Sequence, residues 1–127
     1  MRERSEQMQQ RRVVFVVDDE FIIAQTLATI LNHSGFEAIA FDNPEEAFAA
    51  RDEVKPDLLI SDVRMPGMSG IELAVRFRQV QPNCKVLLFS GQASTSDLLK
   101  EARNQGYDFE LLTKPVHPAD LLAKIRT

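Results

Sequence analysis

The fold of this chain is decided by the stretch Leu58-Leu59-Ile60-Ser61-Asp62-Val63-Arg64-Met65-Pro66-Gly67-Met68-Ser69-Gly70. A short apolar run ends at a single carboxylate, Asp62, and a loop rich in proline and glycine follows directly. This pattern predicts a buried strand with Asp62 at its exposed carboxyl end. In open α/β sheets, ligands bind at that edge. Function therefore depends on which other side chains the fold brings to Asp62.

Size and composition are typical of one soluble globular domain. The chain has 127 residues, of which 44% are hydrophobic and 27% charged. Its net charge of −4 and the absence of a basic patch argue against nucleic acid or an anionic membrane as a direct partner. No apolar run is long enough to span a bilayer or to form a signal peptide. A single cysteine, Cys84, excludes an intramolecular disulfide, and we expect a cytoplasmic protein.

Five apolar runs alternate with five helical patterns. The first run, Val13–Val17, is continuously apolar, as in a strand covered on both faces. Strands are predicted over residues 13–17, 36–41, 57–61, 85–89 and 109–113, and helices over 21–33, 44–51, 70–80, 95–103 and 118–127. Parallel neighbours need crossover connections, so this alternation predicts an α/β fold. We expect a five-stranded parallel sheet in the flavodoxin-like order 2-1-3-4-5, with helices on both faces.

Residues at the helix ends support these boundaries. Asn43 is a good cap, Pro44 suits the first helical position, and Gly35 and Gly106 suit helix exits. Four of the helical patterns have an apolar face. These faces are Ile23, Leu27, Ile30 and Leu31; Ile71, Ala74, Val75 and Phe77; Leu98, Leu99 and Ala102; and Leu121, Leu122 and Ile125. Residues 1–12 read as a polar tail, and residues 13–127 as one domain with no second module.

Polar side chains gather where the predicted strands end. They are Asp18, Asp19, Asp62, Ser90 and Lys114. Each alone could be an ordinary cap, turn or surface residue. Three clustered carboxylates would repel one another and raise each other's pKa values, and Mg²⁺, which takes oxygen ligands, would relieve this repulsion. A lysine and a hydroxyl nearby would suit an added phosphoryl group, so the set predicts phosphoryl chemistry at a carboxylate.

In order and spacing, these residues resemble the receiver domain of two-component response regulators over residues 13–126. The matching features are Asp18-Asp19, Asp62 with the loop Met65-Pro66-Gly67-Met68-Ser69-Gly70, Ser90, and Lys114-Pro115. The resemblance implies that Asp62 accepts the phosphoryl group and that Lys114 and Ser90 contact it. It also implies that Mg²⁺ is held by Asp18, Asp19, Asp62 and the backbone carbonyl of Arg64. The Lys114-Pro115 peptide is expected to be cis.

The resemblance further implies a signalling switch rather than an enzyme. The phosphoryl donor would be a phosphohistidine on a sensor histidine kinase or a histidine phosphotransfer domain. His33 and His117 do not resemble such donors and are read as structural. The output would be contact with a downstream protein, or relay to another histidine. We expect a stand-alone receiver that is a monomer, or a weak dimer through the face formed by the last two helices and strand 109–113.

One departure from the family pattern and three alternative classes of protein bear on this interpretation. The family usually has an aromatic residue three positions before the lysine, where this chain has Leu111, so we expect a different output surface. An unphosphorylated interaction scaffold is therefore an alternative. A Mg²⁺-dependent phosphohydrolase would place a second acid where Arg64 stands, and a nucleotide-binding fold would need a glycine-rich loop after the first strand. Arg64 and Gln92 are expected to flank the phosphoryl group.

Overall fold

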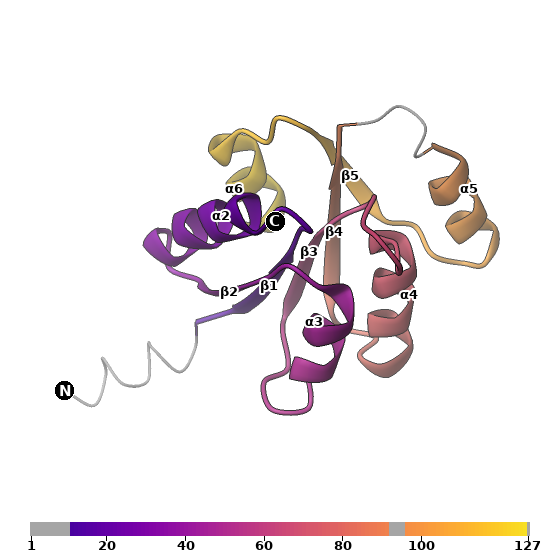
Figure 1. Cartoon of the computed structure of the whole chain (residues 1–127), viewed down its shortest axis with the longest axis horizontal. Helices are drawn as coiled ribbons and strands as arrows, with labels where there is room; N and C mark the ends of the chain where they lie inside the picture. The colour runs from indigo at the N-terminus through magenta and orange to yellow at the C-terminus, as the bar shows by residue number, and fades with distance from the viewer. Residues whose placement is uncertain (1–10, 92–95, 127) are drawn as a thin grey trace.

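The computed structural model describes residues 11–91 and 96–126, in which five strands alternate with five helices (Figure 1). The strands are β1 (Val13–Val17), β2 (Glu37–Phe41), β3 (Leu58–Asp62), β4 (Lys85–Ser90) and β5 (Glu110–Thr113). The helices are α2 (Phe21–His33), α3 (Pro44–Ala50), α4 (Gly70–Val80), α5 (Ser96–Asn104) and α6 (Pro118–Arg126). Almost all of the predicted polar tail lies outside the described residues.

The strands form one parallel sheet in the order β2-β1-β3-β4-β5, which confirms the predicted topology. Its register brings the carboxyl ends of the strands level. Asp62 lies opposite Phe89, and Ser90 lies opposite Thr113. The point where the strand order reverses lies between the carboxyl ends of β1 and β3, and it is there that such sheets bind ligands.

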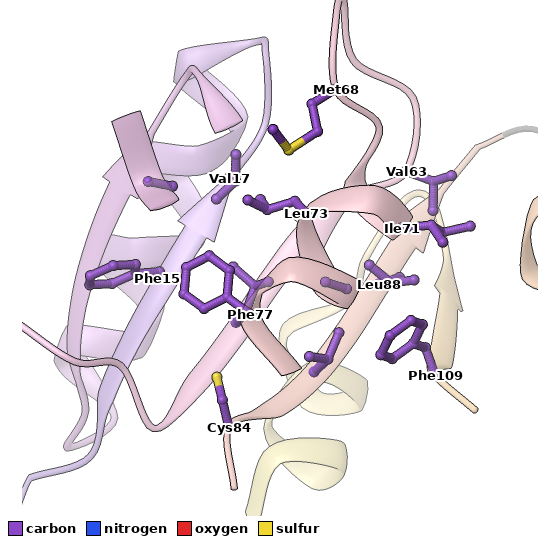
Figure 2. Packing of buried hydrophobic residues seen from close by; sticks show 14 of the residues in the cluster. Phe15, Val17, Val63, Met68, Ile71, Leu73, Phe77, Cys84, Leu88 and Phe109 are labelled. Carbon is purple, nitrogen blue, oxygen red and sulfur yellow. The ribbon is translucent and has the colours of Figure 1, made fainter. Parts of the chain in front are cut away.

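Helices α2 and α6 cover one face of the sheet, and α3, α4 and α5 cover the other (Figure 1). Successive side chains of a strand point to opposite faces, so each strand contributes to two separate cores. Val14 and Val16 belong to the cluster under α2 and α6. Phe15 and Val17 belong to the cluster under α3 and α4, where Phe15 packs edge to face on Phe77 (Figure 2). The continuous apolar run of β1 is thus explained by burial on both faces.

The expected helix ends are confirmed. Asn43 accepts a hydrogen bond from the N–H of Glu46 at 3.0 Å, and Pro44 is the first helical residue of α3. Gly35 and Gly106 both have a φ of 95°, the left-handed conformation that favours glycine after a helix. In the described part of the chain, no helix is long and apolar enough to cross a membrane.

The apolar faces predicted for α4 and α5 both pack on the core, and the structure adds one residue and the depth of burial. In α4, Leu73 is also fully buried, because α4 packs against α3 and α5 as well as on the sheet, and Val75 is half-buried against the same core. In α5, Ala102 is buried, whereas Leu98 and Leu99 remain half-buried. Helix α5 therefore has a thinner apolar contact with the rest of the molecule than its sequence suggested.

Candidate functional site

The five residues singled out at the strand ends lie at one edge of the sheet. Asp18 and Asp19 follow β1, Asp62 is the last residue of β3, Ser90 is the last residue of β4, and Lys114 follows β5. β3 and β4 each extend one residue further than predicted, because Asp62 and Ser90 still pair with the neighbouring strands. The topology thus assembles the predicted set.

Three carboxylates meet at this edge. Asp18, Asp19 and Asp62 each offer an oxygen atom, and these atoms lie within 4.8 Å of one another. Asp18 is fully buried and Asp19 is exposed. Asp62 is only 6% exposed, so the expectation of an exposed strand end was wrong. Its position is covered because the flanking strand ends and the side chain of Lys114 converge on it.

Lys114 joins two of these carboxylates. Its Nζ lies 3.2 Å from Oδ2 of Asp62 and 3.4 Å from Oδ2 of Asp18. Burial alone would lower the pKa of Lys114, but the charges of Asp62 and Asp18 outweigh it, so the pKa is raised and the ammonium group stays charged. The backbone N–H of Lys114 also donates to the carbonyl of Ser90 at 3.0 Å, and the Lys114-Pro115 peptide is cis, as expected.

Asp18 is held by two hydrogen bonds with backbone groups, and the positive charge near it does not offset the effect of burial on its pKa. Its backbone N–H donates to the carbonyl of Phe41 at 3.1 Å, and its Oδ1 accepts from the N–H of Glu20 at 2.9 Å. Burial, with a further contribution from the charge of Asp62, raises the pKa of Asp18 to about 6, although the Glu20 N–H and Lys114 act in the opposite direction. An additional cation would therefore stabilise the ionised carboxylate here.

The donor set fits Mg²⁺. Carboxylate oxygens are the ligands that this hard cation prefers, and it normally keeps several water ligands. The cluster supplies oxygens from three carboxylates, and the exposure of Asp19 gives access to solvent. Arg64 lies two residues beyond Asp62 in the loop before α4, and its carbonyl as a further ligand stays a prediction. Gln92 lies outside the described residues.

Ser90 and Leu111 lie on neighbouring strands. The Ser90 side chain is buried at the end of β4, one position beyond the Phe89 that pairs with Asp62. Leu111 lies opposite Leu88 and is half-buried against the α4 side of the core. The nearby aromatic rings of Tyr107 and Phe109 instead stack on each other, with centroids 5.9 Å apart.

Two further residues lie against Asp62, and the sequence reading did not assign them a role. The Ser61 hydroxyl donates to the backbone carbonyl of Asp62 at 2.9 Å. Gly70, the first residue of α4, approaches the same carbonyl so closely that a Cβ atom there would collide with it. The sequence does contain a signal for Ser61, because this polar residue follows an apolar run and stands directly before Asp62.

The strand order defines a flavodoxin-like α/β protein, and the acidic cluster at its switch point has the oxygen donors that could hold a cation. The family described as the response regulator receiver domain matches residues 14–126. The chain therefore belongs to the receiver domains of two-component response regulators, as its resemblance implied.

Relatives and solved structures agree with this assignment. The chain is 38% identical over 106 residues to the DNA-binding transcriptional regulator NtrC of Salmonella typhimurium, covering 84% of this chain and 22% of that protein. A CheY-like receiver domain from Methanospirillum hungatei superposes with a TM-score of 0.83 at 29% identity, covering 92% of both chains. The response regulator TrrA of Thermotoga maritima, solved in complex with Mg²⁺-BeF, superposes with a TM-score of 0.77 at 29% identity, covering 91% of this chain and 96% of that one. The chain spans half or less of the length of its curated relatives.

Proposed function

We propose that this chain is a phosphorylation-controlled switch of a two-component phosphorelay in which Asp62 accepts a phosphoryl group from a phosphohistidine. The observation that carries the proposal is the bridge from the Lys114 ammonium group to the carboxylates of Asp62 and Asp18. This bridge places a fixed positive charge beside a carboxylate at the ligand-binding edge of the sheet. Receiver domains as a family are signalling switches, and the site supports the same use here.

The proposed chemistry is one phosphoryl transfer. A carboxylate oxygen of Asp62 forms a bond to phosphorus, and the bond from phosphorus to the imidazole nitrogen breaks. The imidazole leaves with the electron pair and is protonated from water, so the product is an acyl phosphate on Asp62. Lys114 would pair with the phosphoryl oxygens, and the Ser90 hydroxyl would donate a hydrogen bond to them. Mg²⁺ held by Asp18, Asp19, Asp62 and the Arg64 carbonyl would supply positive charge against the transferred group.

The phosphodonor is proposed to dock beside the start of α2. Ile22 is 78% exposed there, and Phe21 next to it is also exposed. A hollow of about 490 Å³ between α2 and the chain after β5 has mainly apolar walls and includes Lys114 and Val116 in its lining. This apolar surface is continuous with the site through Lys114, so it supports docking of a histidine kinase or a histidine phosphotransfer domain carrying the phosphohistidine.

The output is proposed to be contact with a downstream protein, or relay to a further histidine. NtrC and MtrA are DNA-binding proteins, but this chain matches only part of each, so we propose no DNA contact for it. Self-association, if it accompanies activation, is proposed as a weak dimer through the face of α5, β5 and α6. Residues 13–127 are proposed as one folding unit of a cytoplasmic protein.

A receiver-shaped scaffold that is never phosphorylated is the second candidate. Leu111 favours it, because the aromatic residue usual at this position of the family is missing. A phosphohydrolase is a third outcome of the same test, although Arg64 occupies the position of the second acid that it would require.

The test is intact mass after incubation with Mg²⁺ and a small acyl-phosphate donor. The switch predicts one added phosphoryl group that is absent in Asp62→Asn and in the presence of a chelator. Asp42→Asn is the matched control, because Asp42 also follows a strand but lies outside the acidic cluster; it should be phosphorylated normally. No adduct would favour the scaffold, and rapid turnover of general phosphomonoesters would favour the hydrolase.

A further inference from the structure

A buried hydrogen bond is formed at the backbone of Asp62 by the residue before it, Ser61. Ser61 is fully buried, and strand alternation directs its side chain toward the α4 side of the sheet, with Leu59 and Val63. A hydroxyl in such surroundings is costly unless it forms a hydrogen bond. Here it donates to the backbone carbonyl of Asp62 at 2.9 Å.

The Ser61 hydroxyl binds the carbonyl of the peptide between Asp62 and Val63, and the N–H of the same peptide is also hydrogen-bonded. The N–H of Val63, which belongs to the same peptide as the Asp62 carbonyl, donates to the carbonyl of Phe89 at 3.1 Å. The plane of the peptide after Asp62 is therefore held from β4 on one side and by Ser61 on the other. The orientation of this plane sets where the chain carries the Arg64 carbonyl, two residues further on.

Gly70, at the start of α4, packs against the same peptide. A Cβ atom at this position would collide with the Asp62 carbonyl and would lie 2.9 Å from the Ser61 hydroxyl oxygen. The Gly70 N–H donates to the carbonyl of Val63 at 2.8 Å, so the start of α4 is bonded to the same short segment. Val63 and Ile71, next to these backbone contacts, belong to one buried cluster (Figure 2).

We propose that Ser61 and Gly70 are positioning residues that hold the backbone of residues 62–64 for phosphoryl transfer. They act through the peptide that carries the Asp62 carboxylate and leads to the Arg64 carbonyl, and neither touches the phosphoryl group. This inference rests on the proposed function. Phosphoryl transfer depends on positioning, so a small displacement of this segment lowers the rate without removing any reacting group.

The test compares four chains: wild type, Ser61→Ala, Ser61→Thr and Asn43→Ala. The measured quantity is the rate constant of phosphorylation at saturating small acyl phosphate and Mg²⁺. Ser61→Ala should be slower by about threefold to tenfold, the range of one net hydrogen bond, with an unchanged half-saturating donor concentration. Ser61→Thr keeps the hydroxyl and should recover the rate. Asn43→Ala removes the equivalent cap of α3, which accepts from the Glu46 N–H at 3.0 Å, so it destabilises a helix outside this segment and should leave the rate unchanged.

A second measurement does not depend on phosphorylation. In Ser61→Ala, the amide hydrogens of Val63 and Gly70 should exchange faster than in Asn43→Ala, because the peptide loses its hydroxyl partner. Unchanged rate and exchange in Ser61→Ala, or an equal slowing in Asn43→Ala, would overturn the inference. If wild type forms no adduct, the proposed function fails, and amide exchange alone decides the positioning role. If Ser61→Ala does not fold, Ser61→Cys, of similar size with a weaker donor, takes its place in every comparison.

Discussion

Lys114 supplies the positive charge that offsets the carboxylates of Asp18 and Asp62. Its ammonium group lies between two carboxylates, one of them fully buried, so its removal leaves Asp18 and Asp62 facing each other without a counter-charge. We predict that Lys114→Met lowers the free energy of unfolding by about 1–3 kcal/mol in urea denaturation with chelator present. We also predict that it lowers the rate of phosphorylation at least about tenfold.

A matched control for this variant is available on the surface. Lys124 pairs with Glu110 at 3.0 Å, but both side chains are about half exposed. Lys124→Met should cost less than about 1 kcal/mol and should not change the phosphorylation rate. Equal losses of stability in the two variants would show that Lys114 has no special electrostatic role.

Cys84 should be chemically inert in the folded protein. Burial raises the pKa of its thiol to about 11, so the reactive thiolate is scarce at pH 8. A thiol-specific reagent at pH 8 should therefore react with Cys84 only after urea unfolds the chain. Because the folded pKa is the higher one, the neutral thiol contributes stability that is full below about pH 8.5 and is lost as the pH rises toward 11. Complete reaction within the mixing time under native conditions would contradict this prediction.

At the scale of single residues, the sequence predicted the positions that follow strands better than their surroundings. Asp62 and Lys114 could be placed because the carboxyl ends of parallel strands share one edge. Which member of the Asp18-Asp19 pair is buried could not be read, since both follow β1 directly. The contact of Gly70 with Asp62 was also unreadable, because it depends on how α4 packs on the sheet.

At the scale of elements, a side chain of α2 forms hydrogen bonds with the outer edge of the edge strand β2. The Asn32 side chain, near the end of α2, accepts from the N–H of Ala38 at 2.8 Å and donates to the carbonyl of the same residue at 3.3 Å. One residue of the exposed edge thus has both backbone groups bonded. Exposed strand edges can pair with other chains, so we expect Asn32 to protect this edge against association.

We predict that Asn32→Ala speeds amide exchange at Ala38 and lowers the free energy of unfolding by about 0.5–1.5 kcal/mol. Size-exclusion chromatography at high concentration should then show more self-association than in wild type. Thr29→Ala is the control, because the Thr29 hydroxyl bonds only to Gln25 of its own helix among the contacts described for it. Equal exchange at Ala38 in the two variants would contradict a covering role for Asn32.

Element boundaries were predicted well where the sequence has strong local signals. The β-branched run of β1 and the Asn43-Pro44 start of α3 were both placed correctly. The sequence did not predict that Leu98 and Leu99 of α5 are only half-buried, because their burial depends on how closely that helix approaches the sheet.

At the scale of the whole molecule, Mg²⁺ should stabilise the fold. A ligand that binds only the native state raises the free energy of unfolding by about 2.7 kcal/mol at a hundredfold excess over its dissociation constant. We predict a Mg²⁺-dependent increase of this kind in thermal or urea denaturation, reversed by chelator. The increase should be smaller in Asp19→Asn, which removes one negative charge from the cluster, and unchanged in Asp42→Asn. A wild type that shows no increase at millimolar Mg²⁺ would contradict a cation site in this cluster.

The central claim is that Asp62 receives the phosphoryl group. The most direct measurement is to phosphorylate the protein from a phosphohistidine donor with Mg²⁺ and reduce the product with borohydride, which converts an acyl phosphate on aspartate to homoserine. The modified residue is then located by peptide mass spectrometry. The account predicts conversion at Asp62, abolished by Asp62→Asn and by chelator. Conversion at another carboxylate, or an unmodified protein after incubation with a competent donor, would contradict it.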